Sequence, residues 1–352
     1  MTIQELMKKV KENDASDLHL VVGSPPMLRS HGRLSPIPES EVLTADLAKS
    51  LVLSMMTEEQ KSKFLTEKEL DFSVALPGLA RFRVNVYIQK SSAAAALRVI
   101  SENIPRIDDL KLPQICHNFA MLRQGFILVT GPTGQGKSST LAAIIEEINQ
   151  TRAEHIITIE DPVEFVYQNG KSIISQRELG GDTKSFARAL KSVLRQDPNV
   201  VLVGEMRDLE TMRLAMTTAE TGHLVFATLH TNSAAQTVDR IIDAFPQEQQ
   251  PQIRTQLANS LEAVLSQRLV PTKDGKRVAA IEVMVATPAV RTNIREGKSH
   301  QLDNIIQTSA EMGMNLLEVS LANWVNKGVV DSQTALSYAN RPAVLSHLLG
   351  GT

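Results

Sequence analysis

Gly131-Pro132-Thr133-Gly134-Gln135-Gly136-Lys137-Ser138 matches the phosphate-binding pattern G-x-x-x-x-G-K-[ST] at each fixed position. The apolar residues 126–130 precede this octapeptide and predict a buried strand. After it, residues 139–148 carry Leu141, Ile144, Ile145 and Ile148 at helical spacing. Strand, glycine loop and helix, in that order, form the context that the motif requires. The octapeptide therefore predicts a site for a nucleoside triphosphate.

The residue types in this loop suit phosphate chemistry. Glycines let successive backbone N–H groups turn toward one point, and the start of the helix adds its positive end there. Lys137 can reach the β and γ phosphates, and the Ser138 hydroxyl can bind Mg²⁺. We therefore expect ATP and Mg²⁺ as ligands. The candidate nucleotide-binding residues are Gly131, Pro132, Thr133, Gly134, Gln135, Gly136, Lys137, Ser138 and Ser139.

Length and composition limit the class of protein. The chain has 352 residues, which is long for one hydrophobic core, and its 42% hydrophobic and 22% charged residues are typical of a soluble globular protein. A net charge of −2 gives no general reason to expect nucleic-acid binding. No apolar run approaches the roughly 20 residues that cross a bilayer, and residues 1–12 lack the apolar centre of a signal peptide. We expect a cytoplasmic protein without direct membrane insertion.

Composition changes along the chain predict two domains. Residues 1–100 alternate short helical and strand-like segments and suggest a small α+β domain with an antiparallel sheet. Residues 101–113 are polar, contain Pro105 and Pro113 and predict a linker. Residues 114–352 form the second expected domain, an α/β fold. Its apolar runs predict a parallel sheet covered by helices, and from Gln247 onward the pattern indicates mostly helix.

Acidic residues follow two of the predicted strands. Glu205 comes directly after residues 200–204, and Glu160 and Glu164 belong to the cluster Glu160-Asp161-Pro162-Val163-Glu164 after another apolar run. Hydrolysis needs a carboxylate that holds Mg²⁺ or orients water, and ligands of open α/β sheets bind at the carboxyl ends of the strands. Ordinary loop acidity is the alternative. Glu205, Glu160 and Glu164 are our catalytic candidates, with Glu205 also a metal ligand.

Two histidines flank the last apolar strand of this region. Thr221-Gly222-His223 precedes residues 224–228, and His230 follows them. A histidine at the carboxyl end of a strand can contact the γ-phosphate by donating a hydrogen bond. Single histidines in such places are usually structural. Two within eight residues, beside a phosphate loop, make His230 a candidate catalytic residue.

These four blocks resemble those of the type II/IV secretion superfamily of hexameric ATPases. They correspond to its Walker A motif, aspartate box, Walker B motif and histidine box. Residues 203–211, Val-Gly-Glu-Met-Arg-Asp-Leu-Glu-Thr, are similar to those of the type IV pilus retraction ATPases, the PilT family. Residues 287–296 resemble its retraction motif A-I-R-N-L-I-R-E, with departures at Val290, Thr292 and Asn293.

The resemblance implies an architecture and a set of partners. It implies a RecA-like P-loop ATPase domain preceded by a PAS-like N-terminal domain, assembled as a hexamer. Arg83 and Arg98 match the arginine pair that a neighbouring subunit supplies in this family, and a guanidinium suits the charge of a transferring phosphoryl group. The implied activity is ATP hydrolysis that drives pilus retraction and twitching motility. Implied partners are an inner-membrane pilus platform protein, through which the motor associates with the membrane, and a paralogous ATPase.

Three alternatives share these motifs. The chain could be the PilU type of retraction paralogue, because of the departures at Val290, Thr292 and Asn293. It could be a type II secretion or pilus assembly ATPase, but those usually carry a four-cysteine zinc site, and this chain has only Cys116. A third alternative is an ATP-binding adaptor with little turnover, which would have no need for two acid-tipped strands. A nucleic-acid motor is disfavoured because no basic or aromatic stripe is present.

Overall fold

The structure is a computed structural model that describes residues 1–30, 32–76, 79–101 and 103–350. It divides into two compact units: unit 1 is Met1–Asn103 with Pro162–Val166, and unit 2 is Ile104–Asp161 with Tyr167–Thr352. Of the expected linker 101–113, residue 102 lies outside the described part, and so do residues 31, 77, 78, 351 and 352 of the two expected domains. The segment Pro162–Val166 packs with unit 1 because Val166 N donates to Ser101 O at 3.2 Å.

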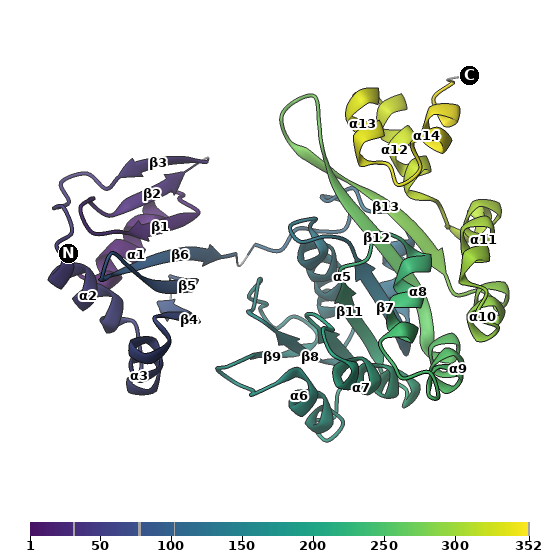
Figure 1. Ribbon diagram of the computed structural model, residues 1–352, viewed down its shortest axis with the longest axis horizontal. Helices are drawn as coiled ribbons and strands as arrows, with labels where there is room; N and C mark the ends of the chain where they lie inside the picture. Colours follow the sequence, from purple (N-terminus) through teal and green to yellow (C-terminus); the bar gives the residue numbers. More distant parts are fainter. Residues whose placement is uncertain (31, 77–78, 102, 351–352) are drawn as a thin grey trace. The chain divides into compact units, whose positions relative to one another are not determined.

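Unit 1 is built on an antiparallel six-stranded sheet with the strand order β3-β2-β1-β6-β5-β4 (Figure 1). Three helices start at threonines whose side chains accept a hydrogen bond from the third backbone N–H of the helix, which satisfies a group that the helix itself leaves unpaired. Their apolar faces form one core with the sheet. The elements are α1 Ile3–Glu12, β1 Asp17–Leu20, β2 Met27–Ser30, β3 Arg33–Pro36, α2 Ala45–Ser54, α3 Glu58–Glu67, β4 Glu69–Leu76, β5 Ala80–Gln89 and β6 Ser92–Ile100.

Unit 2 contains a seven-stranded sheet with the strand order β13-β12-β7-β11-β10-β8-β9 (Figure 1). All neighbours pair in parallel except β12 and β13. The parallel strands β7, β10 and β11 are buried along their whole length, which explains their continuous apolar sequences. The strands are β7 Gly125–Thr130, β8 His155–Glu160, β9 Ile173–Glu178, β10 Val200–Val203, β11 Leu224–Leu229, β12 Leu261–Pro271 and β13 Arg277–Val285.

The helices of unit 2 bury their apolar faces on this sheet and on one another. Helices α5 and α7 pack on β7, and α8 packs on β12 and β13. The described helices are α4 Ile115–Met121, α5 Lys137–Thr151, α6 Phe186–Val193, α7 Leu209–Glu220, α8 Ala234–Asp243, α9 Gln250–Ser260, α10 Pro288–Arg295, α11 Leu302–Thr308, α12 Leu317–Asn326, α13 Ser332–Tyr338 and α14 Pro342–Leu348, with short 3₁₀ turns at Ser299–Gln301 and Ala310–Met312.

The expected fold class is confirmed: a mainly parallel α/β unit follows a smaller unit with an antiparallel sheet. The expectation of mostly helix after Gln247 is wrong for Leu261–Pro271 and Arg277–Val285, which form the long hairpin of β12 and β13 (Figure 1). Both strands are buried on two faces, so their apolar residues do not alternate and give no clear strand period. Pairing of β12 with the distant β7, and of β13 with β12, decides their conformation.

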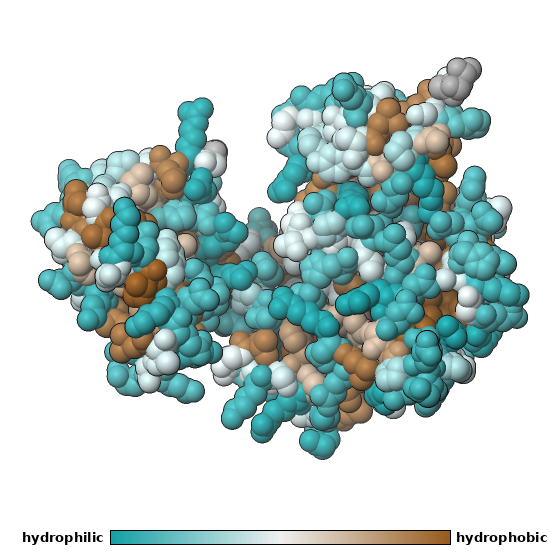
Figure 2. All heavy atoms as spheres, viewed as in Figure 1, coloured by the Kyte–Doolittle hydropathy of each residue, from teal (hydrophilic) through white to brown (hydrophobic). Residues whose placement is uncertain are grey.

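Apolar side chains are gathered inside the units. On the face drawn in Figure 2, hydrophilic residues predominate over both units and hydrophobic ones form small separate groups. Within the described residues, no helix combines the length and the apolar character that crossing a membrane requires.

Candidate active site

The phosphate loop lies between β7 and α5, as the sequence predicts. Gly131, Gly134 and Gly136 have φ angles of +143°, +77° and +79°, which residues other than glycine rarely adopt. Gly136 is the N-cap of α5, and among the described residues no side chain caps this helix start. The first N–H groups of α5 are therefore available to an anion, together with the positive end of the helix.

Strand β12 holds the loop in shape. The backbone N–H of Leu269 donates to Gln135 Oε1 at 2.7 Å, and Gln267 Nε2 donates to the carbonyl of Gln135 at 2.8 Å. Gln267 in turn accepts from the Thr140 hydroxyl on α5 at 2.7 Å. A Cβ atom on Gly131 would lie 2.4 Å from the Gln267 carbonyl oxygen. Glycine at 131 is thus required by both its φ angle and the close approach of β12.

Lys137 is almost fully buried at the start of α5, with 9% of its surface exposed. Its Nζ donates to the carbonyls of Gly131 at 2.6 Å and Pro132 at 3.1 Å, and it lies 3.3 Å from His230 Nδ1. Burial lowers the pKa of Lys137, and the negative charge of Glu205 works against that shift. The ammonium is thereby held at the centre of the loop, where a phosphate would meet it.

Glu205 and His230 meet at the carboxyl ends of neighbouring strands. Glu205 follows β10, His230 follows β11, and these two strands pair in parallel. His230 Nε2 lies 2.9 Å from Glu205 Oε1, and Arg207 Nη2 lies 2.9 Å from Glu205 Oε2. Burial works to raise the pKa of Glu205, but its contacts with Arg207 and His230 outweigh this and lower it. Glu205 is therefore a carboxylate at neutral pH.

Glu160 lies at the end of β8, next to the end of β10. It is 8% exposed and accepts a hydrogen bond from the Thr158 hydroxyl at 2.6 Å and from Gln176 Nε2 at 3.3 Å. A Cβ atom on Gly204 would lie 3.2 Å from Glu160 Cα, so the two strand ends pack closely. The two acid-tipped strands that the sequence predicts therefore reach the same edge of the sheet.

Glu164, Arg83 and Arg98 belong to unit 1. Arg83 on β5 and Arg98 on β6 are directly opposite in the antiparallel register. Like charges in such a pair repel, and acidic groups lie beside both: Glu164 is 3.9 Å from Arg83 Nη1, and Asp17 is 2.7 Å from Arg98 Nε. The Arg98 side chain is 71% exposed and that of Arg83 45%. Two adjacent guanidinium groups are thus presented at the surface of the unit.

His223 lies at the amino end of β11, whereas His230 follows its carboxyl end. The His223 Nδ1 atom is 3.0 Å from the carbonyl oxygen of Thr218, at the end of α7. Because a six-residue strand separates the two histidines, they do not converge on one site. The residues of this motif therefore divide between opposite edges of the sheet.

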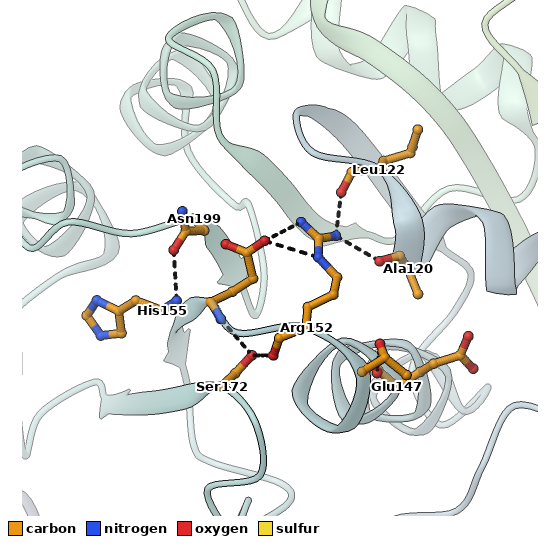
Figure 3. Close-up of polar contacts among 9 residues, drawn as sticks. Ala120, Leu122, Glu147, Arg152, His155, Ser172 and Asn199 are labelled. Carbon is orange, nitrogen blue, oxygen red and sulfur yellow. Dashed lines mark hydrogen bonds and ion pairs between the residues drawn. The ribbon is translucent and has the colours of Figure 1, made fainter.

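A polar network that includes Arg152 occupies the amino edge of the sheet (Figure 3). The Arg152 guanidinium donates to the carbonyls of Ala120 and Leu122 at 2.8 and 2.6 Å, and to Glu154 at 2.9 Å. The Ser172 hydroxyl donates to the Arg152 carbonyl at 2.7 Å. This network connects the ends of α4 and α5 to the start of β8. It lies at the edge of the sheet opposite to that of Lys137, which follows the carboxyl end of β7.

A pocket of about 710 Å³ opens within unit 2 beside the phosphate loop. One wall comes from Gly136, Ser139 and Thr140, and another from the segment 109–112. The β12–β13 hairpin completes the pocket through Leu269 and through the basic residues of its tip. Its size suits a drug-sized ligand or nucleoside.

Sequence reasoning did not find two groups of contacts at this site. Gln267 and Leu269 were missed because their strand was not predicted. Residues 261–270 contain only two β-branched residues, Val264 and Val270, interspersed with polar ones, so their sequence gives no clear strand signal. Arg207 belongs to residues 203–211, which resemble the Walker B region of the family, but nothing in a single sequence indicates that its side chain pairs with Glu205.

A phosphate loop, a strand-end carboxylate and a histidine at the carboxyl edge of a parallel sheet define a P-loop nucleotide-binding protein. The family model described as "Type II/IV secretion system protein" matches residues 1–337. The chain belongs to this family, and the resemblance found in its sequence is confirmed.

Individual relatives agree with this assignment. The chain is 45% identical over 347 residues to the type IV pilus retraction ATPase PilT of Pseudomonas aeruginosa, covering 97% of this chain and 99% of that protein. It is 40% identical over 341 residues to the type IV pilus ATPase PilU of the same species, covering 97% and 89%. A crystal structure of the pilus retraction motor PilT with bound ADP superposes with a TM-score of 0.91 at 43% identity, covering 99% of both chains.

Proposed function

We propose that this protein is an ATP-hydrolysing motor that drives retraction of type IV pili. One observation carries the proposal: His230 contacts both Lys137 in the phosphate loop, at 3.3 Å, and Glu205, at 2.9 Å. A cation for the phosphates and a carboxylate that can orient water are parts that phosphoryl transfer to water needs, and His230 links the two. Similarity to PilT supports retraction as the mechanical output.

In this proposal the phosphates of ATP bind to Lys137 and to the backbone N–H groups of the loop 131–138, where every residue except Pro132 has one, with Ser139 beside them. The nucleoside part occupies the adjoining pocket, against Leu269 and the segment 109–112. ATP would then replace the loop carbonyls as the partner of the Lys137 ammonium. Burial of that lysine supports this, since a phosphate compensates its desolvation better than two carbonyls do.

Mg²⁺ fits the oxygen donors of this edge. The Ser138 hydroxyl at the start of α5 and the Glu205 carboxylate are hard ligands of the kind that Mg²⁺ prefers. When bound, Mg²⁺ would neutralise charge on the phosphates. Glu205 orients the attacking water, since its lowered pKa keeps it an acceptor of hydrogen bonds. Glu160 and Glu164 assist, and His230 reports the state of the γ-phosphate to the strand ends.

Arg83 and Arg98 act in the active site of a neighbouring subunit. Their direct pairing in the sheet of unit 1 and their exposure support this role. Two fixed guanidinium groups stabilise the charge that spreads over a transferring phosphoryl group. The protein therefore works as a homo-oligomer in which each site is completed across a subunit boundary. Its resemblance to the type II/IV secretion ATPases implies that this oligomer is a hexamer.

The motor acts in the cytoplasm, at the inner membrane, on a pilus platform protein. Hydrolysis changes the angle between residues 1–100 and residues 114–352 about the linker 101–113, as a hinge.

The PilU-type paralogue is the second candidate, favoured by 40% identity to PilU. Deletion of the gene should leave excess pili and abolish twitching motility if the protein is a retraction motor, whereas loss of the pili would favour an assembly ATPase.

Complementation between two inactive variants tests the shared site. Arg83→Ala with Arg98→Ala leaves Glu205 intact, and Glu205→Gln leaves both arginines intact. Each variant alone should release phosphate from MgATP at least about 10²-fold more slowly than the unaltered chain. Mixed rings should recover part of the activity, because some boundaries join an intact Glu205 to intact arginines. No recovery in rings shown to be mixed contradicts the role in trans, and no turnover by the unaltered chain favours the adaptor.

A further inference from the structure

His117 on α4 contacts carboxylates on two other segments of unit 2. Its Nδ1 atom lies 2.9 and 2.8 Å from the two carboxylate oxygens of Glu147 on α5. Its Nε2 atom lies 3.4 Å from Oδ1 of Asp108, in the turn that precedes α4. Helix α5 begins at Lys137, so this histidine joins the turn to the helix that carries the phosphate loop.

Hydrogen-bond chemistry defines the charge of this histidine. An ionised carboxylate only accepts hydrogen bonds, so both ring nitrogens of His117 must carry a proton to satisfy both neighbours. The hydrogen bond with Glu147 raises the pKa of His117; burial opposes this, and Asp108 adds to it. The imidazolium thus bridges two negative charges that belong to different segments.

The other groups near the ring leave this bridge undisturbed. Cys116, its neighbour in α4, stays a neutral thiol because burial raises its pKa to about 12. Arg152 directs its guanidinium to Glu154, and Glu147 points away from that network (Figure 3). Glu147 and Asp108 are therefore the charged groups that face His117.

The turn with Asp108 forms one wall of the pocket beside the phosphate loop. Lys111 N donates to Asp108 O at 3.0 Å, so the turn is closed by its own backbone. Leu110, Lys111 and Leu112 line the same pocket as Ser139 and Thr140. A force that holds Asp108 against α4 and α5 therefore holds this wall in place.

We propose that His117 is a positioning residue for nucleotide binding: its imidazolium clamps the Asp108 turn to α5 and so fixes one wall of the nucleoside pocket. The inference rests on the proposed function, because it takes this pocket as the place of the nucleoside. Deprotonation of His117 releases the turn. Nucleotide affinity therefore falls as the pH rises through the pKa of His117, which lies above the ordinary value.

The test measures MgADP binding by calorimetry from about pH 6 to about pH 9, the range in which histidine titrates. The unaltered chain is compared with His117→Gln and with Asp108→Ala, which removes the partner in the turn. The control is His300→Gln, an exposed histidine elsewhere in unit 2. Ratios of dissociation constants between chains cancel the titration of ADP itself. The His117 side chain is 31% exposed, so the substitution is compatible with folding.

At the acid end, both His117→Gln and Asp108→Ala should bind MgADP roughly two- to fivefold more weakly than the unaltered chain, as expected for a partly exposed ion pair. At the alkaline end the three affinities should converge, and His300→Gln should follow the unaltered chain throughout. If the ratio of the MgADP dissociation constants of His117→Gln and the unaltered chain stays constant with pH, the inference is overturned while the proposed function is left intact. Absence of MgADP binding to the unaltered chain at every pH overturns both.

Discussion

A Cβ atom placed on Gly131 would lie 2.4 Å from the carbonyl oxygen of Gln267, closer than side-chain carbons approach backbone oxygens in proteins. The phosphate loop is therefore shaped by the strand beside it as well as by its own sequence. Gly131 also has a φ of +143°, so strain and collision coincide at this position. Strand β12 is thereby part of the nucleotide site.

Substitution of Gly131 by alanine should displace the loop from β12 and weaken ATP binding by about tenfold or more, since the strain amounts to roughly 1–3 kcal/mol. Gly134→Ala is the matched control. Its φ of +77° is also unfavourable, but nothing lies within 4 Å of its added Cβ. Binding of MgATP to both variants, measured by calorimetry, checks this. Equal affinities for the two would show that β12 does not shape the loop.

Ile294, in the segment that resembles the retraction motif, has an interior role in this fold. It is 1% exposed on α10, and Val290 on the same helix is 0% exposed. Both pack in the main core of unit 2. The apolar face of this helix is thus directed inward, and its partner-facing side can only be the polar one.

Ile294→Ala should lower the free energy of unfolding by about 2–5 kcal/mol, the usual effect of truncating a buried isoleucine. Arg295→Ala, at an exposed position next to it, should change the same quantity by less than about 0.5 kcal/mol. Denaturant unfolding of the two variants decides the matter. A fully stable Ile294→Ala variant would mean that the helix does not pack as described.

Glu282 on β13 is fully buried and accepts a hydrogen bond from Ala234 N at 2.7 Å. Burial raises its pKa to about 7, although Ala234 and Arg341 oppose the shift. The folded protein holds this proton more tightly than the unfolded chain does. The protonated Glu282 carboxyl therefore contributes its full stabilisation of the fold below about pH 4.5, and this stabilisation is lost as the pH rises through about 7.

The free energy of unfolding of Glu282→Gln, taken relative to that of the unaltered chain, should therefore be larger at pH 8 than at pH 5. The difference should be on the order of 3 kcal/mol at most. Glutamine retains an acceptor for Ala234 N and removes the charge. The exposed Glu248→Gln serves as the control. Urea unfolding at both pH values gives the difference, and a pH dependence unchanged by Glu282→Gln would show that this carboxyl is ionised in the folded protein.

Local sequence was sufficient for the elements that carry the phosphate site. Residues 126–130, the glycine loop and the helix after it are neighbours in the chain, and their patterns do not depend on distant partners. The antiparallel strands of residues 70–100 were equally accessible, because alternation along 81–88 marks one buried face. The opposite placement of Arg83 and Arg98 follows from the register of that hairpin.

Contacts between distant segments were not accessible. Strand β12 pairs with β7 across more than a hundred residues, and Gln267 reaches Gln135 only because of that pairing. His223 and His230 are close in sequence, yet a strand carries them to opposite edges of the sheet. Short separation in the chain indicates a shared site when a loop joins two residues, and the reverse when a strand does.

The central claim is that Glu205 directs hydrolysis of ATP held by the phosphate loop. Glu205→Gln keeps the size of the side chain and removes its charge. Phosphate release from MgATP should fall by about 10²-fold or more, the usual contribution of a positioned base, whereas MgATP affinity should stay within about threefold of the unaltered chain. Turnover by Glu205→Gln at the rate of the unaltered chain, with MgATP still bound, would contradict this account.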